Sequence, residues 1–420
     1  MIPAKPDGAV IKNVPWIVVD AQTFNDHVRI YTEQTARSAG MDGVPWLDPS
    51  HRPPTAPEFF MVDHLPPGKT PLGATRLMLR LAGIGVVVAA VAGAFAYVQG
   101  TLDPHRLTPK ALVNVLEKNN GVYPGFRRNH AKGVCVIGYF ESSPEVRPYS
   151  SAQVFSAART PVVGRFALPS GNPYAPDTSV PISSLALRFK QANGQQWRTG
   201  MNSMPVFPVG TPEAFYQLQQ AQSPDPATGK PNPASVPAFF AAHPEAVPFL
   251  QWVKTAKPSA SYATERYNSI NAFYLVNAAG QRQAVRWGVV PVAASDAGAG
   301  PPDSADFLEK DLLQRLQAGP LRWQMNITLA GPEDPINDAS KPWQGEHKVL
   351  NAGTLVLERA QAQNNGECRD INYDPLILPS GIEGSDDPLL AARSAAYASS
   401  YLRRTSEVGQ LPAAKQESSQ

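Results

Sequence analysis

The stretch "RRNHAKGVCVIGYFE" (127–141) places three cations and one histidine directly before an apolar run. Valine, isoleucine, tyrosine and phenylalanine dominate the second half, which therefore predicts a β-strand. His130 would stand just before that strand, and three interpretations are open for it: a solvated turn residue, a core histidine or a catalytic base. In the third interpretation, two of the neighbouring cations would serve an anionic cofactor.

Further strand-like segments follow this stretch, and helical segments come between and after them. Strands are expected at 133–141, 160–168, 183–191, 271–287 (a hairpin with its turn at 277–280), 322–330 and 353–360. Helices are expected at 107–118, 211–222 and 303–318. Thr108 and Pro109 fit the N-cap and the first position of the first helix. The proline-rich segment 223–247 is expected to be an irregular wrapping loop. The pattern predicts an α+β fold, an antiparallel β-barrel core with helical decoration.

The composition restricts the class of protein. A net charge of +2 with 17% charged residues gives no reason to expect a nucleic-acid partner. The 43 prolines and 31 glycines indicate a loop-rich chain. The sequence has only two cysteines, Cys135 and Cys368, which excludes a disulfide framework, and neither has the spacing of a metal site. Two buried thiols are expected, and a single bridge stays open.

Residues 81–98 form a run of 18 uncharged, mostly apolar residues, close to the length that spans a bilayer. Lys69, Arg76 and Arg80 precede the run, and no cation follows it until Arg106. By the positive-inside rule the N-terminus then lies in the cytoplasm and the later residues lie across the membrane. A transmembrane signal-anchor helix is therefore expected before the barrel. A buried core helix and a cleaved signal peptide remain open.

The expected domain organisation follows from this helix. Residues 1–75 lack sustained periodicity and are expected to be a disordered cytoplasmic extension, with translation starting at Met61 as a hypothesis. Intact-mass measurement of the native protein tests that start. The anchor occupies 76–99, and 100–407 form the domain in the periplasm or otherwise outside the cytoplasm. Residues 408–420 are polar and are expected to be a disordered tail.

Segment 386–404 predicts an alanine-rich helix that starts at Asp387 and Pro388. At about 100° per residue, Arg393, Tyr397 and Arg404 lie within about 40° of one another. One interpretation is a plain surface helix, in which this shared face has no functional significance. The functional interpretation is a tyrosine held as phenolate by an arginine one turn away, which is the tyrosine type of haem ligation.

Four segments, in this order along the chain, resemble the haem catalase superfamily. They are "RRNHAKGVCVIGYFE", "TPVVGRFALPSG", "TGMNSMPVFPVGTPEAF" and "RSAAY". The chain most resembles the minimal branch of that superfamily, the catalase-related (catalase-like) peroxidases, over about residues 107–405. The resemblance implies a catalase-like barrel that binds haem b.

The resemblance also assigns the catalytic residues and the iron ligand. His130 matches the distal histidine that removes the peroxide proton and passes it to the leaving oxygen. Asn202 matches the distal asparagine that hydrogen-bonds the peroxide. Tyr397 matches the proximal tyrosinate that binds the haem iron, and Arg393 matches the arginine that keeps this tyrosine ionised.

The remaining cofactor-binding residues are cations and aromatic side chains. Arg127, Arg165 and Arg404 match the three cations that accept the haem propionates, a bidentate role suited to guanidinium. Phe215 matches an aromatic residue on the distal side. Phe207 is expected in the same pocket.

The chain departs from the true catalases at three further positions near these site residues. Ala167 replaces the serine that hydrogen-bonds the distal histidine, Pro181 replaces the main-channel aspartate, and Tyr401 replaces a histidine after the proximal tyrosine. The C-terminal additions of large catalases and a nucleotide-binding stretch are absent from the sequence, so NADPH is not expected.

The sequence therefore predicts a haem peroxidase that reduces hydrogen peroxide or organic hydroperoxides with a small organic electron donor. The helix at 81–98 is expected to attach the protein to a membrane. Whether the protein forms a homodimer is left open. Three alternatives stay open: a catalase that disproportionates hydrogen peroxide, a hydroperoxide isomerase of the allene oxide synthase type, and a non-enzymatic haem-binding protein.

Overall fold

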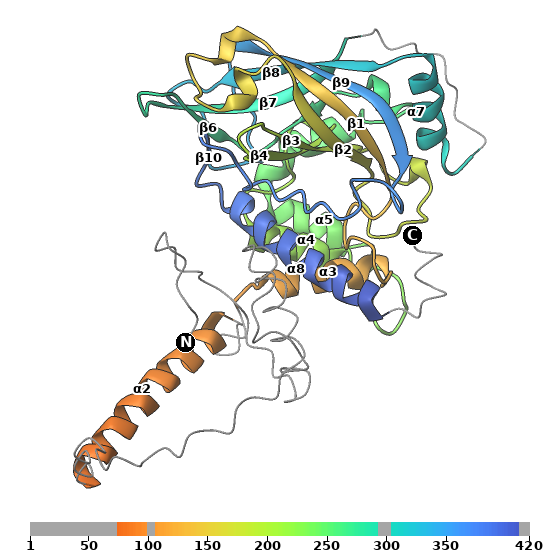
Figure 1. The fold of residues 1–420 in the computed structure, drawn as a ribbon. Coiled ribbons are helices and arrows are strands. Elements are labelled where there is room, and N and C mark those ends of the chain that lie inside the picture. Colours follow the sequence, from red (N-terminus) through yellow and green to blue (C-terminus); the bar gives the residue numbers. More distant parts are fainter. Residues whose placement is uncertain (1–73, 99–105, 293–303, 411–420) are drawn as a thin grey trace, which may run out of the picture. The chain divides into compact units, whose positions relative to one another are not determined.

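The structure, a computed structural model, describes residues 74–98, 106–292 and 304–410. Its central feature is an antiparallel β-sheet (Figure 1). The strands of this sheet are β1 Gly133–Ser142, β2 Thr160–Ala167, β3 Ser184–Lys190, β4 Gln196–Asn202, β5 Tyr267–Asn268, β6 Phe273–Val276, β7 Arg282–Pro291, β8 Leu321–Leu329, β9 Val349–Ala362 and β10 Ile382–Gly384.

The sheet closes into a barrel because β7 pairs with β5 on one side and with β8 on the other. The closed order is β7-β5-β4-β3-β2-β1-β9-β8, and β6 and β10 extend it from β7. Every pairing among these strands is antiparallel. Closure leaves the eight barrel strands without a free edge, and it confirms the predicted antiparallel barrel.

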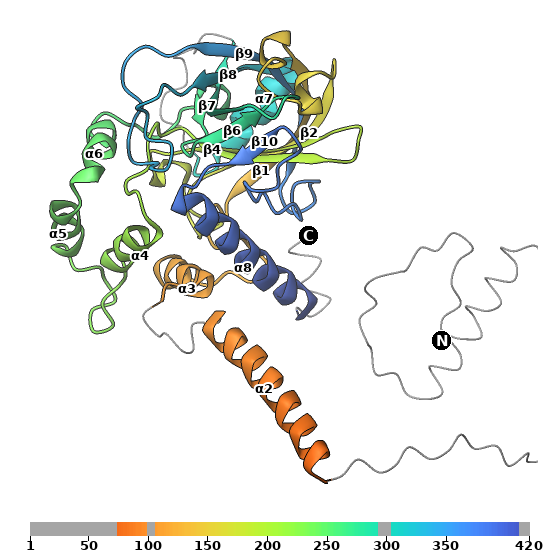
Figure 2. The same cartoon turned by 90° about the vertical axis from the view of Figure 1, so that its left-hand side faces the viewer.

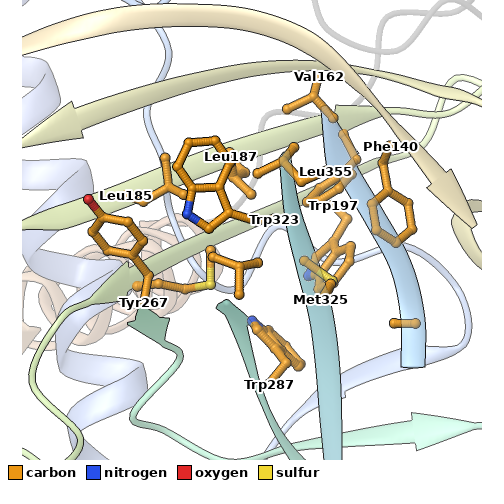
Figure 3. Close-up of a cluster of buried hydrophobic side chains, with 14 of the residues drawn as sticks. Phe140, Val162, Leu185, Leu187, Trp197, Tyr267, Trp287, Trp323, Met325 and Leu355 are labelled. Carbon is orange, nitrogen blue, oxygen red and sulfur yellow. The ribbon is translucent and has the colours of Figure 1, made fainter. Parts of the chain in front are cut away.

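Large apolar side chains fill the interior of the barrel (Figure 3). Successive residues of a strand point to opposite faces of the sheet, and here alternate residues point inward. The inward-pointing residues of β1 to β4 include Val134, Val136, Val162, Phe166, Leu185, Leu187, Trp197 and Met201. The side chains between them therefore point out of the barrel on the same four strands.

Helices decorate the outside of the barrel. Their bounds are α3 Pro109–Asn120, α4 Pro212–Ala221, α5 Ser235–Ala242, α6 Val247–Val253, α7 Phe307–Ala318 and α8 Pro388–Gln410. Helices α3, α4 and α8 lie together on one side of the barrel (Figures 1 and 2). The Thr108 hydroxyl accepts a hydrogen bond from the Ala111 N–H, which confirms the predicted N-cap. Helix α7 packs its Phe307, Leu308 and Leu312 against the core.

A further helix, α2 Ala74–Val98, precedes the barrel domain in the chain. Its segment Met78–Tyr97 is 20 residues long, has a mean hydropathy of 2.0 and contains no buried residue. By length and composition this segment could cross a membrane, although signal sequences share these properties. Residues 1–73 of the expected extension 1–75 lie outside the described residues, and Ala74 and Thr75 belong to α2.

Three local expectations are wrong. Helix α5 lies inside the segment 223–247 that was expected to be irregular, because Pro237 falls in its first turn, where a proline costs the helix no hydrogen bond. Strand β4 was not expected, since Gly200 and polar residues interrupt its apolar alternation. Helix α8 continues to Gln410, so residues 408–410 of the expected tail are helical; residues 411–420 lie outside the described part.

The two cysteines are not free thiols. Cys135 of β1 and Cys368, in the segment after β9, form a disulfide across 233 residues of sequence. Both are fully buried. Local spacing could not indicate this pair, because the closure of the barrel brings β1 next to β9.

Candidate active site

The candidate active site lies on the outer face of strands β2, β3 and β4, where helices α3, α4 and α8 cover the barrel. A cavity of about 210 Å³ opens there. The strand residues that line it from outward-pointing positions are Arg165 and Ala167 of β2, Ser184 and Ala186 of β3, and Gly200 and Asn202 of β4. The alternation of the strands therefore builds one wall of the cavity.

All nine predicted site residues line this one cavity. They are Arg127, His130, Arg165, Asn202, Phe207, Phe215, Arg393, Tyr397 and Arg404. They come from the segment before β1, from β2 and β4, from α4 and the segment before it, and from α8. Their positions agree with the predicted site, and their individual roles stay predictions.

His130 stands three residues before β1 in a left-handed backbone conformation, with φ of 57°. Histidine is among the residues that adopt this region more readily than most. The Asn129 side-chain oxygen accepts its backbone N–H at 2.9 Å. Its Nδ1 is buried and has no hydrogen-bond partner among the described residues. Ala167, on the same cavity, supplies no hydroxyl for it.

Burial and the positive charges around the cavity set the protonation of His130. They lower its pKa to about 3, with burial as the largest cause, followed by Arg165, Arg393 and Arg127. The imidazole is therefore neutral near pH 7 and can accept a proton.

Asn202 is oriented by a residue that the sequence did not reveal. The Ser184 hydroxyl donates to Oδ1 of Asn202 at 2.5 Å, across the paired strands β3 and β4. The amide NH₂ is thereby left as a donor toward a ligand in the cavity. Ser184 belongs to no motif. Its hydrogen bond to Asn202 depends on the pairing of β3 with β4, which the sequence did not predict.

Replacing Ser184 with alanine is expected to slow about fivefold the reaction with peroxide that the resemblance implies. The amide of Asn202 would lose a hydrogen bond of about 1 kcal/mol that holds its orientation. Stopped-flow measurement of the rate constant with hydrogen peroxide tests this, with cofactor content as the control. A rate equal to that of the unmodified protein would exclude the role of Ser184.

Helix α8 presents Arg393 and Tyr397 to the cavity one turn apart, as predicted. Both side chains approach β4 closely, since a Cβ at Gly200 would lie 3.2 Å from Nη2 of Arg393 and 3.5 Å from the Tyr397 hydroxyl. Arg393 donates to the Gly200 carbonyl and to Oδ1 of Asn271. Asn271, which the sequence also did not reveal, donates in turn to Asp387 at 2.7 Å.

Three guanidiniums, those of the half-buried Arg127 and the buried Arg165 and Arg404, leave the cavity with an excess of positive charge. Burial, with Arg165 as the next cause, lowers the pKa of Arg127 to about 9. Burial lowers the pKa values of Arg165 and Arg404 to about 10. Nε of Arg165 and Nη2 of Arg404 have no hydrogen-bond partner among the described residues. The carboxylate beside them, Asp370, is 71% exposed and lies 3.6 Å from Arg404.

This arrangement fits an anionic cofactor. Buried charges without partners are costly, and a ligand that carries carboxylates would supply the missing partners. Phe207 and Phe215, whose ring centroids are 5.6 Å apart, add an apolar surface to the same cavity. The residues present therefore suit a flat apolar group with acidic substituents, which is the character of haem with its two propionates.

The other two cations of the 127–133 stretch are structural. Arg128 pairs with Glu117 of α3 and Glu407 of α8, and Arg403 of α8 also pairs with Glu117. Lys132 pairs with Asp177 and Asp306, each at 2.7 Å. The first network joins α3 to the helix that carries Tyr397.

Replacing Glu117 with alanine is expected to lower the free energy of unfolding by about 3 kcal/mol, because Arg128 is 3% exposed and would lose one of its carboxylates. Urea unfolding tests this. Glu141→Ala, which removes the exposed partner of Arg159, is the matched control and should cost less than about 1 kcal/mol. Equal losses in the two variants would contradict the prediction.

Comparisons with known proteins identify the fold and the family. Residues 97–419 match the family described as Catalase. The chain is 39% identical over 305 residues to the catalase-related peroxidase of Synechococcus elongatus, covering 71% of this chain and 89% of that protein. It is 31% identical over 306 residues to the catalase-related peroxidase of Mycolicibacterium paratuberculosis, covering 71% and 95%. Catalase A from Saccharomyces cerevisiae has a similar fold, with a TM-score of 0.60 at 20% identity over 67% of this chain and 62% of that one.

With these relatives, the closed barrel and its cavity define an oxidoreductase that acts on peroxide. The chain belongs to the catalase family, in the branch of the catalase-related peroxidases. This confirms the family and the enzyme class predicted from the four motifs.

Proposed function

We propose that the chain is a haem b peroxidase that reduces hydrogen peroxide or organic hydroperoxides with a small organic electron donor. The observation that carries the proposal is the joint presence of His130, Asn202, Tyr397 and three arginines around one cavity, two of them, Arg165 and Arg404, buried. Arg127, Arg165 and Arg404 would hold the propionates, and Tyr397 would bind the iron. When bound, haem supplies an iron that takes up the oxidising equivalents of the peroxide and passes them to a donor.

The side chains of the site divide the work of cleaving the peroxide bond. Neutral His130 takes the proton of the peroxide and returns it to the leaving oxygen, which departs as water or an alcohol. We assign this exchange to Nε2, since Nδ1 is buried without a partner. The NH₂ group of Asn202, oriented by Ser184, donates to the peroxide. Arg393, one turn before Tyr397 on α8, would place a positive charge beside the proposed iron ligand.

Peroxidase activity is favoured over catalase activity by Ala167. This residue lines the cavity and gives His130 no hydrogen-bonding partner where the true catalases carry a serine. In the alternative, a catalase, a second hydrogen peroxide takes the place of the organic donor and is oxidised to oxygen. The absorption spectrum of the purified chain tests haem binding, and parallel assays of oxygen evolution and donor oxidation test the activity. Donor oxidation should exceed oxygen evolution; the reverse result would favour the catalase.

The rate constant with peroxide is expected to stay constant from pH 7 down to pH 5. With a pKa of about 3, His130 is about 99% neutral at pH 5, whereas a histidine of ordinary pKa would be mostly protonated. Propionates would offset part of the arginine contribution, but burial, the largest cause, remains. Stopped-flow rates across this range test the prediction. A tenfold loss with a midpoint near pH 6.5 would contradict it.

We also propose that α2 anchors the chain in a membrane and that the haem domain lies outside the cytoplasm. The apolar segment Met78–Tyr97 supports an anchor. The disulfide between Cys135 and Cys368 supports an oxidising compartment, because disulfides are rare in the cytoplasm. Alkaline phosphatase fused after residue 410 should be active in cells, as this enzyme requires export. An inactive but intact fusion would reject the orientation.

A further inference from the structure

The segment 363–381, between β9 and β10, contributes Asn372 and Tyr373 to the cavity and contains no helix or strand. A long irregular segment at a site needs other contacts to fix its backbone. Its second half is held by hydrogen bonds. Arg198 binds the backbone of Asn372 and Ile377, and the Tyr373 hydroxyl donates to the Val163 carbonyl at 3.3 Å.

The first half, residues 363–371, contacts all three of the arginines proposed to hold the propionates. Nη2 of Arg127 donates to the carbonyl oxygens of Cys368, Arg369 and Ile371 at 2.9 to 3.1 Å. Arg165 donates to the Gln363 side chain, and Arg404 pairs with Asp370. The backbone of this stretch therefore holds Arg127 directly, and its side chains contact Arg165 and Arg404.

The disulfide fastens this same stretch to the barrel. Cys135 stands on β1 opposite Arg165 of β2 and Gln361 of β9, and its partner Cys368 is itself one of the carbonyl residues that hold Arg127. Gly366 allows the close approach, since a Cβ there would lie 2.5 Å from Sγ of Cys135.

The disulfide also belongs to the packing behind the proposed iron ligand. Cys135 and Cys368 form a buried cluster with Val163, Ile371 and Tyr373, and Tyr397 packs against that cluster. Both cysteines are fully buried, so solvent reductants have no direct access to the bond. This burial favours a permanent positioning role over a redox switch.

We propose that the Cys135–Cys368 disulfide is a positioning element for the anionic cofactor: it holds residues 363–371 so that Arg127, Arg165 and Arg404 face the cavity in the geometry that retains it. The proposal rests on the proposed haem function. It predicts that cofactor retention depends on this covalent link more than on the overall stability of the fold.

The test compares haem dissociation from the full chain in detergent with and without the disulfide. Haem transfer to an excess of haem-free myoglobin gives the rate, at a temperature where circular dichroism shows every variant folded. Cys135→Ala/Cys368→Ala should release haem at least tenfold faster than the unmodified chain. The control Leu355→Ala removes a fully buried core side chain of β9 that does not line the cavity. Leu355→Ala is expected to lose about as much unfolding free energy as the disulfide-free variant. Its rate of haem release should nevertheless stay within twofold of the unmodified rate.

A double-mutant cycle that combines Arg127→Met with loss of the disulfide distinguishes positioning of the arginines from a general loosening of the fold. If the disulfide acts through the arginines, Arg127→Met should raise the rate in the unmodified chain but add little in the disulfide-free variant. Equal rates with and without the disulfide, fully additive effects, or two alkylatable thiols in the native protein would overturn the inference. An unmodified chain that binds no haem would instead reject the proposed function.

Discussion

Tyr397→Phe is expected to give a folded protein that has lost its haem. The tyrosine oxygen is the proposed iron ligand, and phenylalanine keeps the ring that packs against the Cys135–Cys368 cluster while removing that oxygen. We expect the haem affinity to fall more than about 100-fold, which corresponds to about 3 kcal/mol of binding free energy. Haem titration followed by absorption spectroscopy measures this.

Tyr401→Phe is the matched control, since Tyr401 lies one turn further along α8 and lines the same cavity. Its phenol is not assigned to the iron, so haem affinity should change less than about threefold. Circular dichroism of both variants excludes misfolding. If Tyr397→Phe retained haem with an unchanged spectrum, the iron would have another ligand.

His130→Ala is expected to keep the haem and lose the reaction with peroxide. General acid–base catalysis by a positioned histidine typically contributes 10²- to 10⁴-fold, and we expect a loss of about this size in the rate constant with hydrogen peroxide. The haem spectrum should change little, because His130 is not assigned to the iron or the propionates. Stopped-flow mixing with peroxide measures the rate.

Added imidazole provides a control on the interpretation of His130→Ala. The alanine variant leaves space for a free base at the position of the side chain, so imidazole should restore part of the rate. A variant with an unchanged rate would rule out His130 as the base. A lost rate together with lost haem would indicate a structural role instead.

Much of the barrel could be predicted because its strands have local signals. Alternating apolar residues in β1, β2 and β3, and the Thr108 cap of α3, depend on residues close together in the chain. Strand β4 escaped prediction because Gly200 and polar residues interrupt its apolar alternation, and Gly200 lies where Arg393 and Tyr397 of α8 approach the strand. Helix α5 escaped because proline was treated as a breaker although Pro237 stands in the first turn.

Among the site residues, those carried by motifs were predicted and those defined by long-range contacts were not. His130, Asn202 and Tyr397 stand in recognisable segments, and helical spacing placed Arg393 beside Tyr397. Ser184 and Asn271 belong to no motif, and their importance comes from hydrogen bonds to Asn202, Arg393 and Asp387.

The sequence by itself determined the antiparallel barrel, the apolar helix and the family, because each has a local pattern of residue types. The tertiary structure decided which cations serve the cavity and which serve the fold: Arg127 faces the site, whereas its neighbour Arg128 pairs with Glu117 and Glu407. It also decided that Cys135 and Cys368 are joined rather than free. Glu407 is distant in the chain from Arg128, as Cys368 is from Cys135, and only closure of the barrel and docking of α8 bring these pairs within bonding distance.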